Sequence, residues 1–278
     1  MFGRRTNQGY DGYPQQGRRG NLKITIIIGL VMAGFALFKY YSAEQVNPIT
    51  GEKQHISISA DQEIAIGLQS APQMIQQYGG LYPDQKTQDL VKQVGQKLVQ
   101  GTIAAKSEYP YEFYVLSDPN TVNAFALPGG QVFITTALLG RLENEAQLAG
   151  VLGHEIGHVI HRHGAERIAK MDLTEGLTGA AVIAAGDYQS AQFAQMVGNL
   201  INMKYGRDQE LESDDFGVRL LIEAGYDPQA LMGVMDILEQ SSGGQTVPEF
   251  QSTHPSPENR REKIMEAIKK YNSGEGTH

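Results

Sequence analysis

The sequence contains no cysteine among its 278 residues. This absence excludes disulfide bonds, zinc sites built from thiolates, a cysteine nucleophile and a lipid attached through an N-terminal cysteine. Any metal site in this chain therefore has to use histidine and carboxylate ligands. An oxidising compartment is consistent with the lack of cysteine but is not required by it, because many cytosolic proteins lack cysteine as well.

Positive charge is scarce outside the N-terminus. The net charge of the chain is −8, and residues 1–23 carry five Lys or Arg residues against one Asp, so the remainder carries −12. An acidic body of this kind argues against a nucleic acid as partner. The length allows one globular domain of about 200 residues with appendages.

Long apolar runs are also rare, and a single segment, residues 22–41, has the roughly 20 residues required to cross a bilayer as a helix. Residues 1–21 are rich in Gly, Gln and Arg and predict a disordered basic tail. We expect a retained transmembrane anchor with this tail in the cytoplasm. One alternative is a cleaved signal peptide, although Lys39–Ala43 makes a poor cleavage site. The other is a buried core helix, which the preceding basic tail disfavours.

The rest of the chain predicts a linker at residues 42–58, one catalytic domain at 59–271 and a flexible C-terminus at 272–278. Capping residues predict where three helices begin: Ser59 with Gln62, Asp84, and Asn144 with Gln147. Short β-type stretches lie only between Tyr111 and Thr135. Beyond Asn144 we expect helices near residues 145–170, 173–204, 206–224, 228–240 and 257–271. The predicted fold class is α+β, mainly α.

One motif carries chemistry: His154-Glu155-Ile156-Gly157-His158 falls inside the helix that follows Asn144. Residues four apart lie on one helix face, so both imidazoles can reach one metal ion, while Glu155 points about 100° away. Zinc held in this way keeps an open position for water, and Glu155 can act as the general base. The alternative, two histidines satisfied within the core, is disfavoured by the spacing.

A third ligand has to come from elsewhere, because Gly164 stands where the motif with a third histidine requires one. Glu210 and Asp214 lie one turn apart on a later helix. Glu210 can ligate zinc while Asp214 accepts a hydrogen bond from a ligating imidazole. In isolation this segment would be interpreted as a solvated acidic helix face.

With these residues in place, the chain resembles the HtpX and CAAX-prenyl-endopeptidase type of zinc metalloprotease, the gluzincins, and most of all the periplasmic BepA-like and LoiP-like peptidases. The motifs that match, in the expected order, are Asn123–Gly130, Asn144–Ala149, His154–His158, Glu210–Asp214, Thr253–Pro255 and Arg260. The resemblance implies a zincin-type domain with one Zn²⁺ on His154, His158 and Glu210.

The resemblance also implies roles for residues around the metal. The strand containing Gln131, Val132 and Phe133, together with Asn123, would be an exposed edge on which an extended substrate pairs through its backbone. His254 is similar to the family's mobile histidine, which acts as a brake on the metal or stabilises the reacting carbonyl. Arg260 would orient site carboxylates. A plain loop histidine and a surface arginine are the alternatives.

Two departures from the family are visible. The chain has no cysteine for a lipid anchor and only one evident membrane span. Residues 173–204 are rich in Ala, Gly, Met and Ile, and they fit either a second membrane segment or a helical lid over the site. Polar residues interrupt this stretch, so we favour the lid.

The predicted function is a zinc endopeptidase for extended, unfolded or misassembled envelope proteins. It would be tethered to the bacterial inner membrane as a single-pass protein, with its N-terminus cytoplasmic and its catalytic domain periplasmic. A protease with a narrow processing role is one alternative. Another is a zinc-stabilised latent protease that acts mainly as a chaperone or scaffold, plugged by His254 and residues 173–204.

Overall fold

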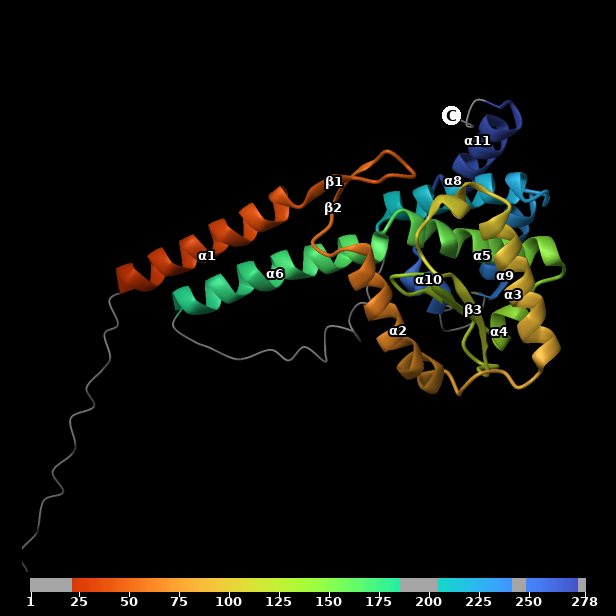
Figure 1. Cartoon of the computed structure of the whole chain (residues 1–278), viewed down its shortest axis with the longest axis horizontal. Helices are drawn as coiled ribbons and strands as arrows, with labels where there is room; N and C mark the ends of the chain where they lie inside the picture. The colour runs from red at the N-terminus through yellow and green to blue at the C-terminus, as the bar shows by residue number, and fades with distance from the viewer. Residues whose placement is uncertain (1–21, 186–204, 242–248, 275–278) are drawn as a thin grey trace, which may run out of the picture.

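The structure, a computed structural model, describes residues 22–185, 205–241 and 249–274. It is mainly helical, as the sequence predicts, and the described residues form two small sheets (Figure 1). The predicted tail at 1–21 and the last four residues of the predicted C-terminal segment lie outside the described residues. The helices are α1 (Leu22–Ser42), α2 (Ala60–Gln77), α3 (Gln85–Gln100), η1 (Ile103–Lys106), α4 (Thr136–Leu139), α5 (Glu145–Ile160), α6 (His163–Ala185), α8 (Arg207–Glu223), α9 (Ala230–Ser241), α10 (Glu249–Thr253) and α11 (Arg260–Asn272). The strands are β1 (Glu44–Val46), β2 (Lys53–His55), β3 (Glu112–Leu116), β4 (Ala124–Ala126) and β5 (Gln131–Thr135).

The predicted helix starts are confirmed by their capping contacts. Ser59 and Gln62 form a reciprocal capping box at the start of α2, and the Asp84 side chain accepts from the backbone of Thr87 at α3. The Asn144 side chain accepts a 3.0 Å hydrogen bond from the Gln147 backbone amide at the start of α5. These contacts satisfy N–H groups that the first turn of a helix leaves without a partner.

The prediction of one continuous helix over residues 145–170 is wrong, because the helix is interrupted between α5 and α6. Arg162 adopts a left-handed backbone conformation with φ 55°. Its guanidinium donates to the buried carboxylate of Glu63, at 2.7 Å from Nε, and to the carbonyl of Ile58 at 3.0 Å. These contacts to α2 and the segment before it hold a conformation that a non-glycine residue rarely adopts.

The larger sheet has the strand order β3-β5-β4, with β3 parallel and β4 antiparallel to β5. The expectation that Gln131, Val132 and Phe133 form an exposed edge is therefore wrong. They lie in the central strand β5, whose residues are all buried and whose backbone is paired on both sides. The strand at the edge is β4, which follows Asn123 directly.

The predicted linker at residues 42–58 contains a second, two-stranded antiparallel sheet, β1 with β2. The expectation of sheet structure only between residues 111 and 135 is therefore wrong. The side chain of Asn47 explains the hairpin, because its Oδ1 accepts from the backbone of Ile49 and Thr50, and its Nδ2 donates to the carbonyl of Ile160 at 2.8 Å. The hairpin is thereby fixed to the end of α5.

Glycines allow α5 and α8 to pack unusually close. A Cβ on Gly157 would lie 2.9 Å from the Ser213 carbonyl oxygen, and one on Gly217 would lie 3.2 Å from the His154 nitrogen. Both distances are shorter than ordinary van der Waals contact. The close approach brings the ligand-bearing faces of the two helices together.

We expect Gly157→Ala to push α5 and α8 apart. Overpacking of this kind should lower the free energy of unfolding by about 1–3 kcal/mol, and it should weaken zinc binding as well. Gly150→Ala on the same helix is the matched control, because its Cβ would meet Leu231 at an ordinary 3.5 Å. Urea unfolding and zinc titration measure both effects. Equal stability of the two variants would contradict this account of the packing.

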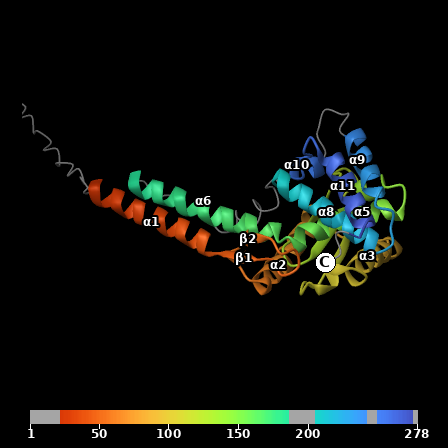
Figure 2. The ribbon, with the colours of Figure 1, turned by 90° about the horizontal axis from the view of Figure 1, so that it is seen from above.

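α1 and α6 lie side by side and project from the rest of the protein (Figures 1 and 2). Within the described residues, α1 is the one helix that is long and apolar enough to cross a membrane. Little of it is buried in the protein, which disfavours a core helix. Residues 173–185 of the predicted 173–204 helix belong to α6 and lie along α1, so this part does not cover the site, while 186–204 lie outside the described residues.

Candidate metal centre

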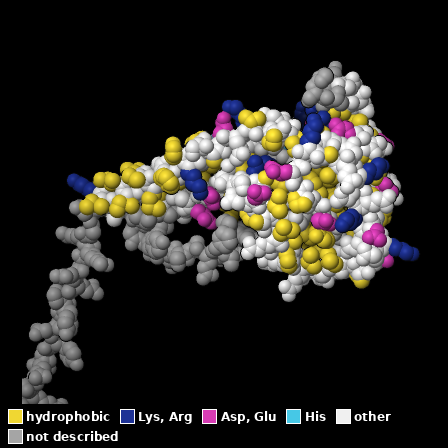
Figure 3. All heavy atoms as spheres, in the orientation of Figure 1, with side chains coloured by type: hydrophobic (Ala, Val, Ile, Leu, Met, Phe, Trp, Pro, Cys, Tyr) yellow, Lys and Arg dark blue, Asp and Glu magenta, His cyan; other side chains and the backbone are white. Residues whose placement is uncertain are grey.

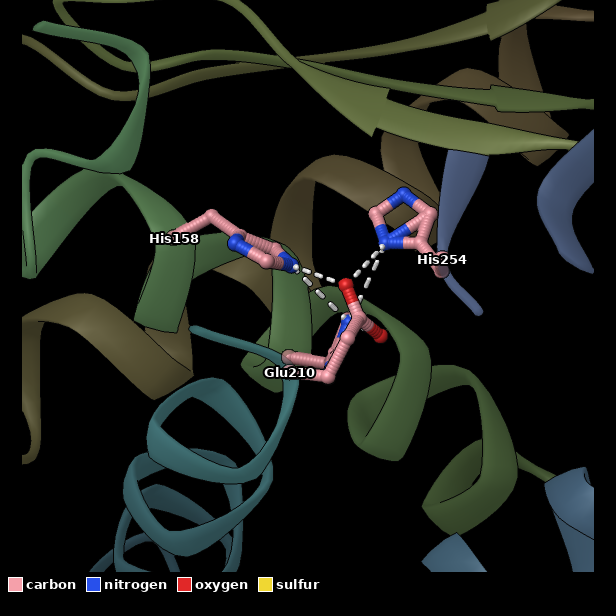
Figure 4. A group of neighbouring side chains, drawn as sticks. His158, Glu210 and His254 are labelled. Atoms are coloured by element: carbon pink, nitrogen blue, oxygen red, sulfur yellow. Dashed lines mark hydrogen bonds and ion pairs between the residues drawn. The ribbon is translucent and has the colours of Figure 1, made fainter. Parts of the chain in front are cut away.

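Two helices and the segment after a third bring the predicted metal residues together. His154 and His158 project from one face of α5, and Glu210 comes from the first turn of α8. His254 follows α10 directly. Figure 4 shows the side chains of His158, Glu210 and His254 pointing toward one another. The four side chains are at most 2% exposed.

The potential ligand atoms of His154, His158, Glu210 and His254 all lie within 4.8 Å of one another. The two Nε2 atoms of His154 and His158 are 3.1 Å apart, and a Glu210 oxygen lies 3.5 Å from His158 Nε2. His254 Nδ1 lies 3.2 Å from the same Glu210 oxygen and 3.4 Å from His154 Nε2. Nitrogen ligands about 2.1 Å from zinc in a tetrahedron are about 3.4 Å apart, so the spacing fits one ion.

The protonation of the histidines also fits a cation. Burial lowers the pKa of His154, against the opposing effect of Asp214, and holds that of His158 well below its ordinary value, so both imidazoles are neutral. His154 Nδ1 donates to Asp214 Oδ1 at 2.8 Å, which leaves a lone pair on its Nε2. With His158 protonated on Nδ1, its own Nε2 lone pair faces that of His154. Two lone pairs and a carboxylate that face one point form a donor set that suits a cation.

Arg260 and Asp214 form a buried network behind the ligands. Arg260 donates from Nε to Asp214 Oδ2 at 2.6 Å, and its Nη1 lies 3.4 Å from Glu210. Burial alone would raise the pKa of Asp214, but the charge of Arg260 and the hydrogen bond from His154 lower it to about 2. Asp214 therefore stays ionised and holds the His154 ring in one orientation, while Arg260 fixes both carboxylates.

His163 was not assigned a role from the sequence, yet it contacts a candidate ligand. His158 Nδ1 lies 2.8 Å from His163 Nδ1, and His163 Nε2 lies 2.9 Å from Glu212. With His163 donating to Glu212, its Nδ1 accepts from His158 and leaves His158 Nε2 free for a metal. The sequence carries no signal for this contact, because His163 is five residues from His158 and belongs to the next helix.

Tyr205 is a second residue that sequence patterns do not reveal. Its ring stacks on His158 with centroids 3.7 Å apart, and the Arg167 guanidinium lies 3.8 Å from the Tyr205 ring centre. Its backbone amide donates to the carbonyl of Thr253. Tyr205 thus links the segment before α8 to the segment that positions His254.

Glu155 is fully buried beside the cluster but is not among the convergent ligand atoms. Burial raises the pKa of its carboxyl to about 8, opposed in part by the positive charges of Arg167 and Arg260. His254 Nε2 lies 3.8 Å from Glu155 Oε1. A carboxyl group with a pKa near the working pH can both accept and return a proton.

A pocket lies beside the site and along the edge strand β4. Its lining includes Asn123, Phe125 and Ala126 together with Tyr205 and His254. The edge strand therefore faces the candidate metal residues, whereas the predicted strand β5 lies one position further into the sheet.

Known proteins are similar in sequence to this chain over most of its length. It is 30% identical to the mitochondrial metalloendopeptidase OMA1 of Schizosaccharomyces pombe, over 86% of this chain and 71% of that protein. It is 30% identical to the beta-barrel assembly-enhancing protease of Escherichia coli K12, over 86% of this chain and 50% of that protein. It is 36% identical to the metalloprotease YcaL of the same organism, over 57% of this chain and 61% of that protein. The chain spans about half the length of the beta-barrel assembly-enhancing proteases that it matches.

The family model described as peptidase family M48 matches residues 85–268. This range contains α5, α8, His254 and Arg260, and it covers more than half of the chain. The chain belongs to peptidase family M48 and is a metalloprotease.

Proposed function

We propose that the protein is a zinc-dependent endopeptidase that hydrolyses unfolded or misassembled envelope proteins as part of protein quality control. The convergence of two neutral imidazoles and one carboxylate beside the buried Glu155 carries this proposal. His154, His158 and Glu210 would hold one Zn²⁺ in a zincin-type arrangement. The names of two relatives, a mitochondrial metalloendopeptidase and a beta-barrel assembly-enhancing protease, support a proteolytic function.

In the proposed mechanism the chain positions the substrate and moves one proton. Zinc would supply a Lewis acid that polarises the peptide carbonyl and lowers the pKa of a water molecule to about 7. The Glu155 carboxylate takes the proton of the attacking water and returns it to the leaving amine. Asp214, Arg260 and His163 hold the ligand side chains in place. An extended polypeptide would pair with the edge strand β4 beside the pocket, which favours backbone recognition over sequence preference.

The membrane part of the proposal rests on α1. Its length, its apolar composition and its low burial favour a membrane anchor. With its basic N-terminal tail, the protein would have its N-terminus in the cytoplasm of a bacterium and its catalytic domain in the periplasm, at the inner membrane.

The full-length protein in detergent should degrade casein, lose this activity on chelation and regain it with equimolar zinc. A zinc content of one ion per chain should accompany the recovery. Cleavage that survives complete metal removal would contradict the proposed mechanism.

A latent state is favoured by the position of His254 within the ligand cluster. Its Nδ1 fills the position that substrate or water needs, and burial holds the pKa of His254 well below its ordinary value, so it is a neutral potential ligand. We expect His254→Ala to increase casein hydrolysis several-fold, with His55→Ala as the control remote from the site. Unchanged activity would rule out the brake, and a loss of activity would assign His254 to stabilising the reacting carbonyl.

A further inference from the structure

The α1–α6 arm, which comprises residues 22–42 and 163–185, is built for close helix pairing. The two helices run antiparallel, since Lys39 pairs with Asp172 while Gly176 lies against Ala36. A Cβ on Gly176 would lie only 2.8 Å from the Ala36 Cβ. Small residues of this kind let two helices approach closely within a membrane, where the hydrophobic effect does not drive helices together.

The surface of the arm is strongly apolar. On α1 the side chains of Leu30, Phe35 and Phe38 are 68–70% exposed, and Figure 3 shows hydrophobic side chains covering the projecting arm. A groove of about 400 Å³ lies between the two helices. It is lined mainly by apolar side chains from both of them, including Val31, Phe35 and Leu173. Soluble proteins rarely expose apolar surface of this extent.

Charge is distributed unevenly along α6. All of its charged residues lie in the part nearer the rest of the protein, and the last two of them are Asp172 and Glu175. Residues 176–185 carry no charge. The uncharged part lies beside the apolar stretch of α1. The Lys39–Asp172 ion pair, at 3.0 Å, lies near this boundary, about one turn closer to the rest of the protein than Glu175.

We propose that residues 176–185 of α6 lie within the outer leaflet of the lipid bilayer beside α1. Acyl chains would occupy the part of the groove that Val31, Phe35 and Leu173 line, and the Lys39–Asp172 pair and Glu175 would lie at the headgroups. Ten helical residues are about 15 Å long, half of the roughly 30 Å hydrocarbon core. The segment therefore enters the membrane without crossing it. This inference rests on the proposed membrane anchoring of α1.

The arrangement links the membrane to the metal centre through one helix. His163, the first residue of α6, contacts His158 at 2.8 Å, and Gly176 is 13 residues further along. That separation corresponds to about 20 Å of helix. The active site would stand at this height above the membrane surface, within reach of polypeptides that emerge from the bilayer.

The native chain has no cysteine, so single cysteines report on individual positions without a background. The full-length variants Leu30→Cys on α1, Leu177→Cys on α6 and Leu68→Cys on α2, all at exposed leucines, would be placed in liposomes of phosphatidylethanolamine and phosphatidylglycerol. A membrane-impermeant maleimide should label Leu68→Cys, and the other two only after detergent is added. Labelling of Leu177→Cys with Leu30→Cys protected would overturn this inference alone. Labelling of both would overturn the anchor as well.

Disulfide formation tests the pairing of the helices in the same liposomes. The double variant Ala36→Cys with Gly176→Cys should form an intramolecular disulfide on mild oxidation, because the two Cβ atoms are in contact. Gly34→Cys with Gly176→Cys is the control, since a Cβ on Gly34 has nothing within 4 Å. Absence of a disulfide in the first pair, or equal yields in both, would show that α6 does not lie against α1 in the membrane and would overturn the proposal.

Discussion

Glu155→Gln should reduce casein hydrolysis by about 10²–10⁴-fold, the usual contribution of a general base, while one zinc ion remains bound. Glutamine keeps the shape of the side chain but cannot accept the proton of water. Metal retention is expected because Glu155 is not one of the convergent ligand atoms. The substitution also removes a buried carboxyl whose pKa is raised to about 8 by burial, so the folded state should lose no stability.

The control for this experiment is Glu145→Gln, which changes an exposed glutamate on the same helix α5. Its activity should equal that of the native chain. Zinc content and the thermal unfolding midpoint of both variants should be measured beside the rates. Activity retained in Glu155→Gln would remove the general base from the mechanism, and loss of zinc together with activity would assign Glu155 to metal binding instead.

Arg260→Met should give the largest loss of stability, about 3–5 kcal/mol, which is typical when one partner of a buried ion pair is removed. Methionine fills much of the volume but leaves Asp214 and Glu210 buried without their cation. The Asp214 carboxylate, which accepts the hydrogen bond from the His154 ring, is then no longer held in a fixed position. We therefore expect weaker zinc binding as well as a lower thermal midpoint.

Arg261→Met is the matched control at the next position. Arg261 lies on the surface and pairs with the exposed side chains of Asp236 and Glu239. Exposed ion pairs contribute about 0–1 kcal/mol, so this variant should unfold close to the native temperature. Similar losses in both variants would contradict the buried network.

Acid unfolding tests the same network through the sign of the Asp214 pKa shift. The pKa of Asp214 is lowered from 3.8 to about 2, so its ionised form stabilises the fold fully above about pH 4, and this contribution disappears as the pH falls through 2. Arg260→Met should raise the Asp214 pKa and move the acid unfolding midpoint to higher pH. An unchanged midpoint would show that Asp214 does not depend on Arg260.

Local sequence signals were enough wherever the relevant contacts are local. Ser59, Asp84 and Asn144 mark helix starts because a capping side chain bonds an amide only three residues away. His154 and His158 share a helix face because their spacing matches the helical period. The mainly helical fold follows from the same patterns. The metalloprotease family is inferred from the resemblance of several ordered motifs, and the family match confirms it.

Contacts between segments far apart in the chain could not be predicted from the sequence. Arg162 breaks a helix that its neighbours favour, because Glu63, 99 residues away, holds it in a left-handed conformation. The strand that was predicted to be the edge, β5, is central because β3 pairs with it in parallel on the side opposite β4. Strand order depends on the whole sheet and not on one strand.

The sequence by itself predicts which residues can bind a metal and supply a base, since the lack of cysteine and the spacing of His154, Glu155 and His158 leave few alternatives. Only the tertiary structure decided how Glu210 reaches that pair, through the close packing of α5 on α8 that Gly157 allows. It also brought His254, which follows α10, beside Glu210. It alone placed His163 and Tyr205 against His158 and α6 along α1. The physical reason is range: caps and helical periodicity act over a few residues, whereas packing and ion pairs join segments far apart in the chain.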